Sequence, residues 1–227
     1  MRIATYNIHR AIGSDSKENP ERIVSVLNEL NADVVALQEV GFASGEPGNL
    51  LEYLGESTQS RVIEGITFKD ERGHYGNAVL SRHPVNVIKL HDISVPGREP
   101  RGAIELRLEV GDKVVQVIAT HLGLRPGERR EQVEKLMPQL TTSSADIKIL
   151  LGDLNEWFLW GRPLNRLHRV FGYTPAPATF PSRWPLFALD RLWVEPLSAI
   201  VSIQVHKSTN AKTASDHLPL IAQIHLD

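Results

Sequence analysis

The chain has 227 residues, 41% of them hydrophobic and 23% charged, which is enough apolar material to bury a sizeable core. Its 25 basic and 27 acidic residues give a formal net charge of -2, so the composition as a whole points to neither nucleic acid nor an anionic membrane. There is no cysteine, which excludes disulfides, zinc sites with cysteine ligands and thiol nucleophiles.

The N-terminus enters a strand-like pattern without the apolar stretch of a signal peptide, and no window approaches the roughly 18 uninterrupted apolar residues of a membrane span. We therefore expect a cytoplasmic protein with no transmembrane segment and see no sign of an obligate protein partner. Because apolar residues run through the proline-rich stretch 174–185, that stretch reads as an ordered loop, and residues 1–227 are expected to form a single domain.

The expected elements alternate between strand and helix and then become richer in strands. A first helix is expected after Asn19, a capping residue followed by proline, because apolar residues then recur at helical spacing. A hairpin is expected over Gly111-Asp112, and a helix opens near Pro126 that Pro138 should end or kink. A short helix is expected around 162–171, and the expected strands are residues 2–8, 33–39, 61–68, 76–81, 85–93, 102–110, 113–120, 147–152, 188–195, 199–206 and 217–225.

Several of these strands end in polar side chains at the rim of the predicted sheet, which is where layered α/β folds build their sites. Residues i and i+2 of a strand point to the same side, so Asp153 and Asn155 can face one ligand together, whereas Glu156 points away. The recurrence predicts a site, because any one of these residues alone is more typical of a cap or a turn. The polar strand ends are Asn7, Glu39, His121, Asp153 with Asn155, Asp190, and Asp216 with His217.

A cation would explain why so many carboxylates share one rim. If Glu39, Asp153, Asp190 and Asp216 converge, they cannot all stay ionised without compensating positive charge. Ligation by Asp, Glu and Asn oxygens suits Mg²⁺ or Mn²⁺ rather than zinc. A calcium loop starting at Asp153 is excluded, because the glycine that it requires six positions in is Phe158.

Together these segments resemble the endonuclease/exonuclease/phosphatase superfamily, the metal-dependent phosphoesterases that include DNase I-like enzymes. The matching segments occur in the family's order and span nearly the whole chain. They are Thr5-Tyr6-Asn7-Ile8, Gln38-Glu39-Val40, Gly76-Asn77-Ala78-Val79-Leu80-Ser81, Thr120-His121-Leu122, Gly152-Asp153-Leu154-Asn155, Leu189-Asp190-Arg191-Leu192-Trp193 and Ser215-Asp216-His217-Leu218-Pro219.

The resemblance implies a four-layer α/β sandwich, in which two packed, mostly antiparallel β-sheets are flanked by helices. It also implies an Mg²⁺- or Mn²⁺-dependent phosphoesterase that hydrolyses a phosphodiester or phosphomonoester by metal-assisted attack of water. Such chemistry needs positioning and charge neutralisation more than covalent catalysis. The phosphate ester could belong to a nucleic acid, a lipid headgroup or a small molecule. A DNA or RNA nuclease is one alternative, and a non-catalytic binding module that keeps the fold is another.

The resemblance also suggests roles for individual residues. Glu39 looks like the principal metal ligand, helped by Asn7 and Asp216. Asp153 looks like the residue that orients or deprotonates the attacking water. Asn155 and His121 resemble the family's donors to the scissile phosphate. Asp190 resembles the carboxylate that pairs with the final histidine, which in this chain is His217. Whether His217 or Asp153 is the base stays open at this point.

Two further positions are candidates for contact with the substrate. Arg101 precedes a strand and either donates to a phosphate or is a solvated loop arginine. Trp157 opens the segment Trp157-Phe158-Leu159-Trp160, which directly follows the predicted site strand. This segment could stack a base, settle on a lipid interface, or form a helix face that packs into the core.

Overall fold

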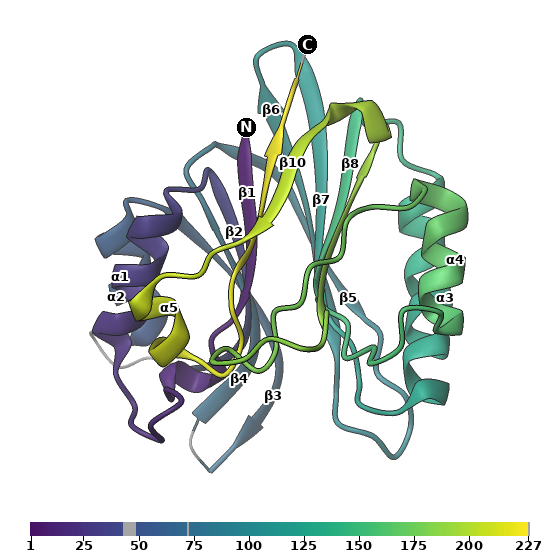
Figure 1. Cartoon of the computed structure of the whole chain (residues 1–227). Coiled ribbons are helices and arrows are strands. Elements are labelled where there is room, and N and C mark those ends of the chain that lie inside the picture. The colour runs from purple at the N-terminus through teal and green to yellow at the C-terminus, as the bar shows by residue number, and fades with distance from the viewer. Residues whose placement is uncertain (43–48, 72, 227) are drawn as a thin grey trace.

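In the computed structural model, which describes residues 1–42, 49–71 and 73–226, two β-sheets pack face to face and helices cover both outer surfaces (Figure 1). The six-stranded sheet has the order β10 (Ile200–Val205), β11 (Leu220–Ile224), β1 (Arg2–Asn7), β2 (Val34–Phe42), β4 (Gly73–Ser81), β3 (Arg61–Asp70). The five-stranded sheet has the order β5 (Val85–Asp92), β6 (Gly102–Val110), β7 (Lys113–His121), β8 (Ile147–Asp153), β9 (Asp190–Glu195). The predicted four-layer sandwich is therefore confirmed.

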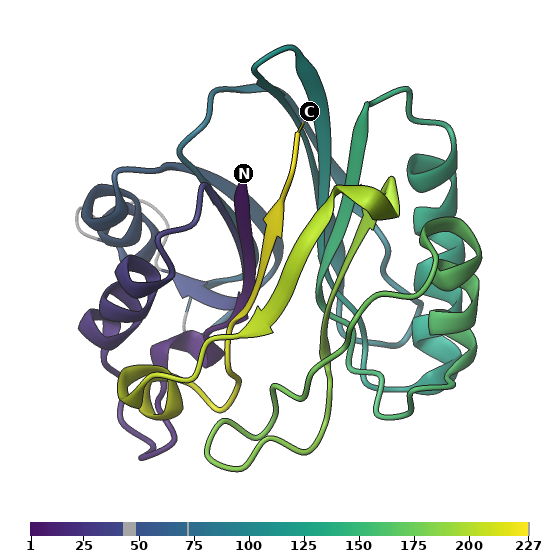
Figure 2. The ribbon, with the colours of Figure 1, turned by 45° about the horizontal axis from the view of Figure 1, so that its top comes forward.

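Most neighbouring strands run antiparallel, as predicted, and the parallel pairs are β1–β2 and β7–β8. Within the described residues, helices pack against the outer surface of each sheet in two groups (Figures 1 and 2). The first group is α1 (Pro20–Leu30), α2 (Leu50–Thr58) and α5 (Thr209–Ala214), and the second is α3 (Pro126–Thr141) and α4 (Arg162–Phe171). Short 3-10 turns lie at His9–Ala11 and Leu197–Ala199.

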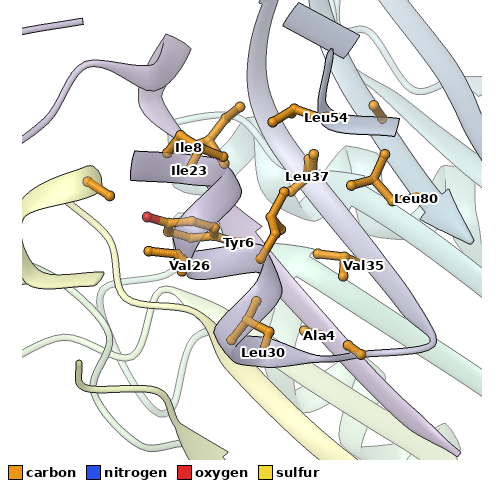
Figure 3. Packing of buried hydrophobic residues seen from close by; sticks show 14 of the residues in the cluster. Ala4, Tyr6, Ile8, Ile23, Val26, Leu30, Val35, Leu37, Leu54 and Leu80 are labelled. Atoms are coloured by element: carbon orange, nitrogen blue, oxygen red, sulfur yellow. The ribbon is translucent and has the colours of Figure 1, made fainter. Parts of the chain in front are cut away.

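Apolar side chains fill three layers of core, one between the sheets and one under each group of helices. Under α1 and α2, Tyr6 and Leu37 from the six-stranded sheet pack with Ile23 and Leu54 from the helices (Figure 3). Between the sheets, aliphatic side chains of β1, β2 and β4 meet those of β6, β7 and β8. The polar strand ends therefore lie at the margin of an apolar interior.

The expected elements agree with the structure in most places. Asn19 caps α1, its side chain accepting from the backbone N–H of Arg22 at 3.0 Å, and the hairpin and the helix at 162–171 are present. The helix that was expected to end or kink at Pro138 instead continues to Thr141, and the Thr142 hydroxyl and N–H both bond to the Pro138 carbonyl. Helices α2 and α5 were not predicted. Within the described residues, no helix has the length and apolarity needed to cross a membrane.

Gly152 fixes how closely β7 and β8 approach beside the site. Its φ is +148°, and a Cβ placed there would lie 1.8 Å from the carbonyl oxygen of Thr120 on the neighbouring strand. Both the backbone angle and the contact exclude a side chain. The glycine that precedes Asp153 is therefore required for β7 and β8 to pair at this rim.

We predict that Gly152→Ala lowers the free energy of unfolding by roughly 3 kcal/mol or more, because strain and overpacking add. Urea denaturation followed by circular dichroism measures this. Gly127→Ala is the matched control, since a Cβ at Gly127 meets no atom within 4 Å. Equal stability of the two variants would contradict the account.

Candidate functional site

The predicted site residues gather where the two sheets end on the same side of the molecule. In the five-stranded sheet His121 on β7 pairs with Asp153 on β8, which pairs with Asp190 on β9, so three polar residues lie side by side. Asn7, at the end of β1 in the other sheet, donates from Nδ2 to Asp153 Oδ2 at 3.0 Å. The rim of one sheet therefore faces the rim of the other across this contact.

Asp153 lies at the centre of this group and is almost fully buried. Its Oδ1 accepts from the backbone N–H of Asn155 at 2.8 Å, and Asn155 has φ +50°, so the chain turns sharply after the strand. Burial, and then the neighbouring Asp190, raise the pKa of Asp153 to about 6, although the positive charge of His217 opposes the rise. The carboxyl is thus ionised at neutral pH but becomes protonated in mild acid.

His217 is held by Asp190, as the resemblance implied. Its Nδ1–H donates to Asp190 Oδ2 at 2.8 Å, and its Nε2 lies 3.8 Å from Asp153 Oδ2. Burial alone would lower the pKa of His217, but the carboxylates of Asp190 and Asp153 outweigh burial and raise the pKa to about 10. The ring is therefore a cation at neutral pH.

His121 is the opposite case. Burial, and then the positive charges of Arg101 and His217, lower the pKa of His121 well below its ordinary value, so the ring is neutral. Arg101 Nη1 donates to His121 Nδ1 at 2.9 Å, which leaves the ring proton on Nε2. That Nε2 lies 3.6 Å from Asp153 Oδ2 and 3.0 Å from the amide Nδ2 of Asn155. Two N–H groups therefore open onto the same small space.

Arg101 is not a solvated loop residue. It is 7% exposed, contacts His121, and pairs through Nη2 with Glu99 at 2.9 Å. Its Nε is buried and has no hydrogen-bond partner within the described residues. The alternative of a solvated loop arginine is therefore excluded, and the contact of Arg101 with phosphate stays a prediction.

The three predicted metal ligands lie beside this group. Asn7 Nδ2 donates to Glu39 Oε1 at 3.0 Å as well as to Asp153, while Asn7 Oδ1 accepts from the N–H of His9 at 3.0 Å. Asp216 lies 3.8 Å from the His9 ring and is partly exposed. The donor set of two carboxylates and one amide fits Mg²⁺ or Mn²⁺ chemistry. Coordination by the Asn7 oxygen would replace its contact with His9.

A second arrangement of potential ligands exists within the described residues. Asp153, Asp190 and His217 each bring one ligand atom within 4.8 Å of the others. A metal requires a neutral histidine, however, and the raised pKa of His217 shows that its proton is strongly held. In this trio the two carboxylates share one protonated histidine, which leaves a formal charge of -1.

Two residues of the site carried no signal in the sequence. Thr179 is fully buried, and its hydroxyl donates to Asp190 Oδ2 at 2.6 Å. Phe180 packs against the His217 ring, with centroids 4.8 Å apart. Both lie in the proline-rich stretch 174–185. The sequence pattern of that stretch does not indicate that it contacts Asp190 or His217.

The Trp157 segment is not a helix face in the core. Residues Trp157 to Trp160 lie in the connection between β8 and α4, and all four side chains are exposed. Glu156, expected to point away from the site, is buried and pairs with Arg129 at 3.1 Å. Trp157 nevertheless stays near the site, because its ring contacts Phe180 at 5.9 Å.

Comparison with known proteins agrees with this geometry. The chain is 31% identical to the uncharacterized protein YbhP of Escherichia coli (strain K12), over 100% of this chain and 96% of YbhP. An endonuclease/exonuclease/phosphatase family protein from Leptotrichia buccalis superposes with a TM-score of 0.80 at 18% identity, with 100% of both chains covered. D. rerio TDP2, solved with a single strand DNA product, gives 0.70 at 14% identity, covering 98% of this chain and 97% of TDP2.

The two structural likenesses establish a shared fold. The family assignment rests on the family model described as Endonuclease/Exonuclease/phosphatase family, which matches residues 4–217. All seven segments that suggested the resemblance begin and end between residues 5 and 219, almost entirely within that match. The chain belongs to the endonuclease/exonuclease/phosphatase family.

Proposed function

We propose that this protein is an Mg²⁺- or Mn²⁺-dependent phosphoesterase that hydrolyses a phosphodiester or phosphomonoester by metal-assisted attack of water. One observation carries the proposal. The buried carboxylate of Asp153 directs a single oxygen, Oδ2, toward Asn7 at 3.0 Å, His121 at 3.6 Å and His217 at 3.8 Å. A neutral donor and a cationic donor thus lie next to a base whose pKa is about 6.

Asp153 is the better candidate for the base. A general base must be unprotonated at the working pH and have a pKa not far below it, and Asp153 satisfies both conditions. His217 has a pKa of about 10 and already holds its proton at neutral pH, so it acts as a donor to the phosphate or to the leaving oxygen. Proton transfer from the attacking water to Asp153 Oδ2 brings the proton close to His217 Nε2.

The phosphate is received by N–H groups rather than by the carboxylates. His121 Nε2 and the Asn155 amide Nδ2 are in direct contact at 3.0 Å, and a phosphate oxygen that displaced this contact would accept from both. Arg101 stands behind His121 and adds positive charge. These residues hold the ester so that the water near Asp153 is in line with the bond to be broken.

Charge balance supports a divalent cation. Arg101 is paired with Glu99, and His217 with Asp190 and Asp153, so these two cations already have carboxylate partners other than Glu39 and Asp216. Glu39, with Asn7 and Asp216, would hold Mg²⁺ or Mn²⁺, which when bound neutralises the phosphate charge and stabilises the leaving oxygen. The remaining steps depend on the side chains of the chain itself.

The narrower alternatives are not separated by these observations. A nuclease would use the same residues, and a non-catalytic module is disfavoured because none of the proposed base, donor or ligand residues is replaced. The single-domain organisation and the cytoplasmic location remain predictions. Both are separate from the chemistry, which concerns the rim of the two sheets.

We predict that purified protein with Mg²⁺ or Mn²⁺ hydrolyses bis-p-nitrophenyl phosphate or an ester in a panel of nucleic acids, phospholipids and sugar phosphates. Asp153→Asn should lower kcat by about 10²–10⁴-fold through loss of the base. Its thermal stability should stay equal or rise, because the substitution removes a buried charge beside Asp190. Asp112→Asn, an exposed carboxylate in the β6–β7 turn, is the matched control. Activity that survives both a chelator and Asp153→Asn would refute the proposal.

The charge state of His217 can be measured without substrate or metal. Because its folded-state pKa is raised, its charged form contributes stability below pH 6.5 that is lost as the pH rises through about 10. We expect its ring to stay protonated between pH 5.5 and 8.5 in NMR spectra, with a smaller shift near pH 6 as the neighbouring Asp153 titrates. Asp190→Asn should bring the pKa of His217 down into that range, and His217→Gln assigns the signal. A wild-type midpoint near 6.5 would contradict the ion pair.

Arg101 should matter for substrate binding. Loss of a charge-assisted hydrogen bond to phosphate corresponds to about 10–100-fold weaker binding, so Arg101→Gln should raise KM or the inhibition constant of inorganic phosphate by that factor. It should also raise the pKa of His121, because Arg101 is one of the charges that lower it. Arg98→Gln, an exposed arginine of the same loop, is the control. Unchanged phosphate inhibition would rule out this role.

A further inference from the structure

The largest exposed apolar side chains beside the site belong to two loops. We call residues 157–160 and 184–187 the aromatic loops. Three of the four tryptophans of the chain lie in them, with Trp157 41%, Trp160 73% and Trp184 79% exposed, whereas Trp193 is 1% exposed. Leu159 and Leu186 are also mostly exposed. Such a concentration of solvent-exposed rings and aliphatic chains marks an interaction surface.

The aromatic loops form one surface, and that surface reaches the site. The Trp157 ring contacts Phe187 at 4.8 Å and Phe180 at 5.9 Å, and Phe180 packs on His217 at 4.8 Å. The N–H groups of Phe180 and Phe187 each bond to the carbonyl of the other, which closes the second loop. Figure 2 shows the connection between α4 and β9 extending past the ends of the strands. Whatever occupies the aromatic loops therefore lies next to the proposed catalytic residues.

Charge around the aromatic loops differs from the charge of the whole chain. Residues 157–189 contain none of its 27 acidic residues but include four arginines, 162, 166, 169 and 183. Arg166 pairs with Glu134, whereas Arg162 and Arg183 are exposed and flank the two loops. A cavity of about 430 Å³ is lined by Phe158, Trp160, Arg130 and Arg162, and also by Glu156, whose carboxylate is paired with Arg129. The surface combines apolar chains with positive charge, which fits an anionic amphiphile.

The composition of the loops favours a bilayer over a nucleic acid. Single-stranded nucleic acid is bound on separate aromatic rings with basic residues along a groove. Here four consecutive apolar residues, 157–160, are exposed together, and leucines stand within both loops, where a base gains nothing from them. Tryptophan and phenylalanine with flanking arginine are the side chains typical of the level of lipid headgroups.

We propose that the aromatic loops dock this protein on an anionic phospholipid bilayer, with the rim of the two sheets facing the lipid headgroups. The docking does not depend on the proposed hydrolysis. It is a binding property of residues 157–160 and 184–187 and would persist in a catalytically inactive protein. No transmembrane helix is involved, since the loops enter only the interface.

Sedimentation with vesicles tests the docking, using the full chain and vesicles of phosphatidylcholine with or without phosphatidylglycerol. We expect binding to the anionic vesicles with a blue shift of tryptophan fluorescence. The double variant Trp160→Ser/Trp184→Ser should bind about tenfold more weakly or not at all, because both side chains are exposed and neither touches the site. Arg162→Gln/Arg183→Gln should reduce the preference for anionic vesicles.

Control variants keep the test specific. Leu90→Ser and Val201→Ser also remove exposed apolar side chains, but from edge strands, and should leave vesicle binding unchanged. Circular dichroism verifies folding of every variant. The proposal is overturned if anionic vesicles are not bound, or if binding is the same in the tryptophan variant. It is also overturned if the tryptophan variant loses only the binding of a single-stranded oligonucleotide, or only self-association measured by sedimentation velocity.

Discussion

The site depends most on the hydrogen bond from Asn7 Nδ2 to Asp153 Oδ2, one of several polar contacts that join the two halves of the sandwich, with Asn77 to the Gly102 carbonyl and His217 to Asp190. The sheets otherwise meet mainly through aliphatic side chains, which hold them together without specifying polar geometry. At the rim, Asn7 brings Glu39 and the β1–β2 edge to the carboxylate on β8. The Ser215 hydroxyl bonds to the carbonyl of Asn7 and so ties the segment before His217 to the same point.

The charges at the rim are interdependent. Asp153 loses acidity through burial and through Asp190, while His217 holds its proton because of the same two carboxylates. His121, close by but facing Arg101, is neutral. These three titratable groups are similarly buried but differ in protonation state, because each one faces different charged neighbours. A base, a cationic donor and a neutral donor arise within one small volume, which is the separation of roles that phosphoester hydrolysis requires.

The sequence predicted most of these residues because they lie at or near strand ends, and the family's segments fix their order. Glu39 was expected at the end of strand 33–39 but lies inside β2, where the pairing with β4 is irregular between Leu37 and Val40 and Glu39 has a φ of +55°. It could not predict the partners that reach the rim through tertiary structure. Thr179 and Phe180 lie in a loop whose path is decided by packing, and Arg101 looks like any loop arginine until its burial is known. Helix α5 was missed because six residues are too few for a periodic signal. Pro138 was expected to end α3 because a proline inside a helix removes one backbone hydrogen bond, but α3 continues for three more residues, and the Pro138 carbonyl accepts from the N–H and the hydroxyl of Thr142.

The exposed aromatic side chains follow from what lies beneath them. Glu156, next to Trp157, is buried in an ion pair with Arg129, which also donates to the Leu124 carbonyl, so the chain is anchored at the point where the first aromatic loop begins. At the other end of the loop, a Cβ at Gly161 would meet the Glu156 carboxyl group at 2.4 Å, so glycine leaves room for this ion pair before α4 starts. A surface that costs free energy in water and is held open by a buried ion pair is expected to have a partner.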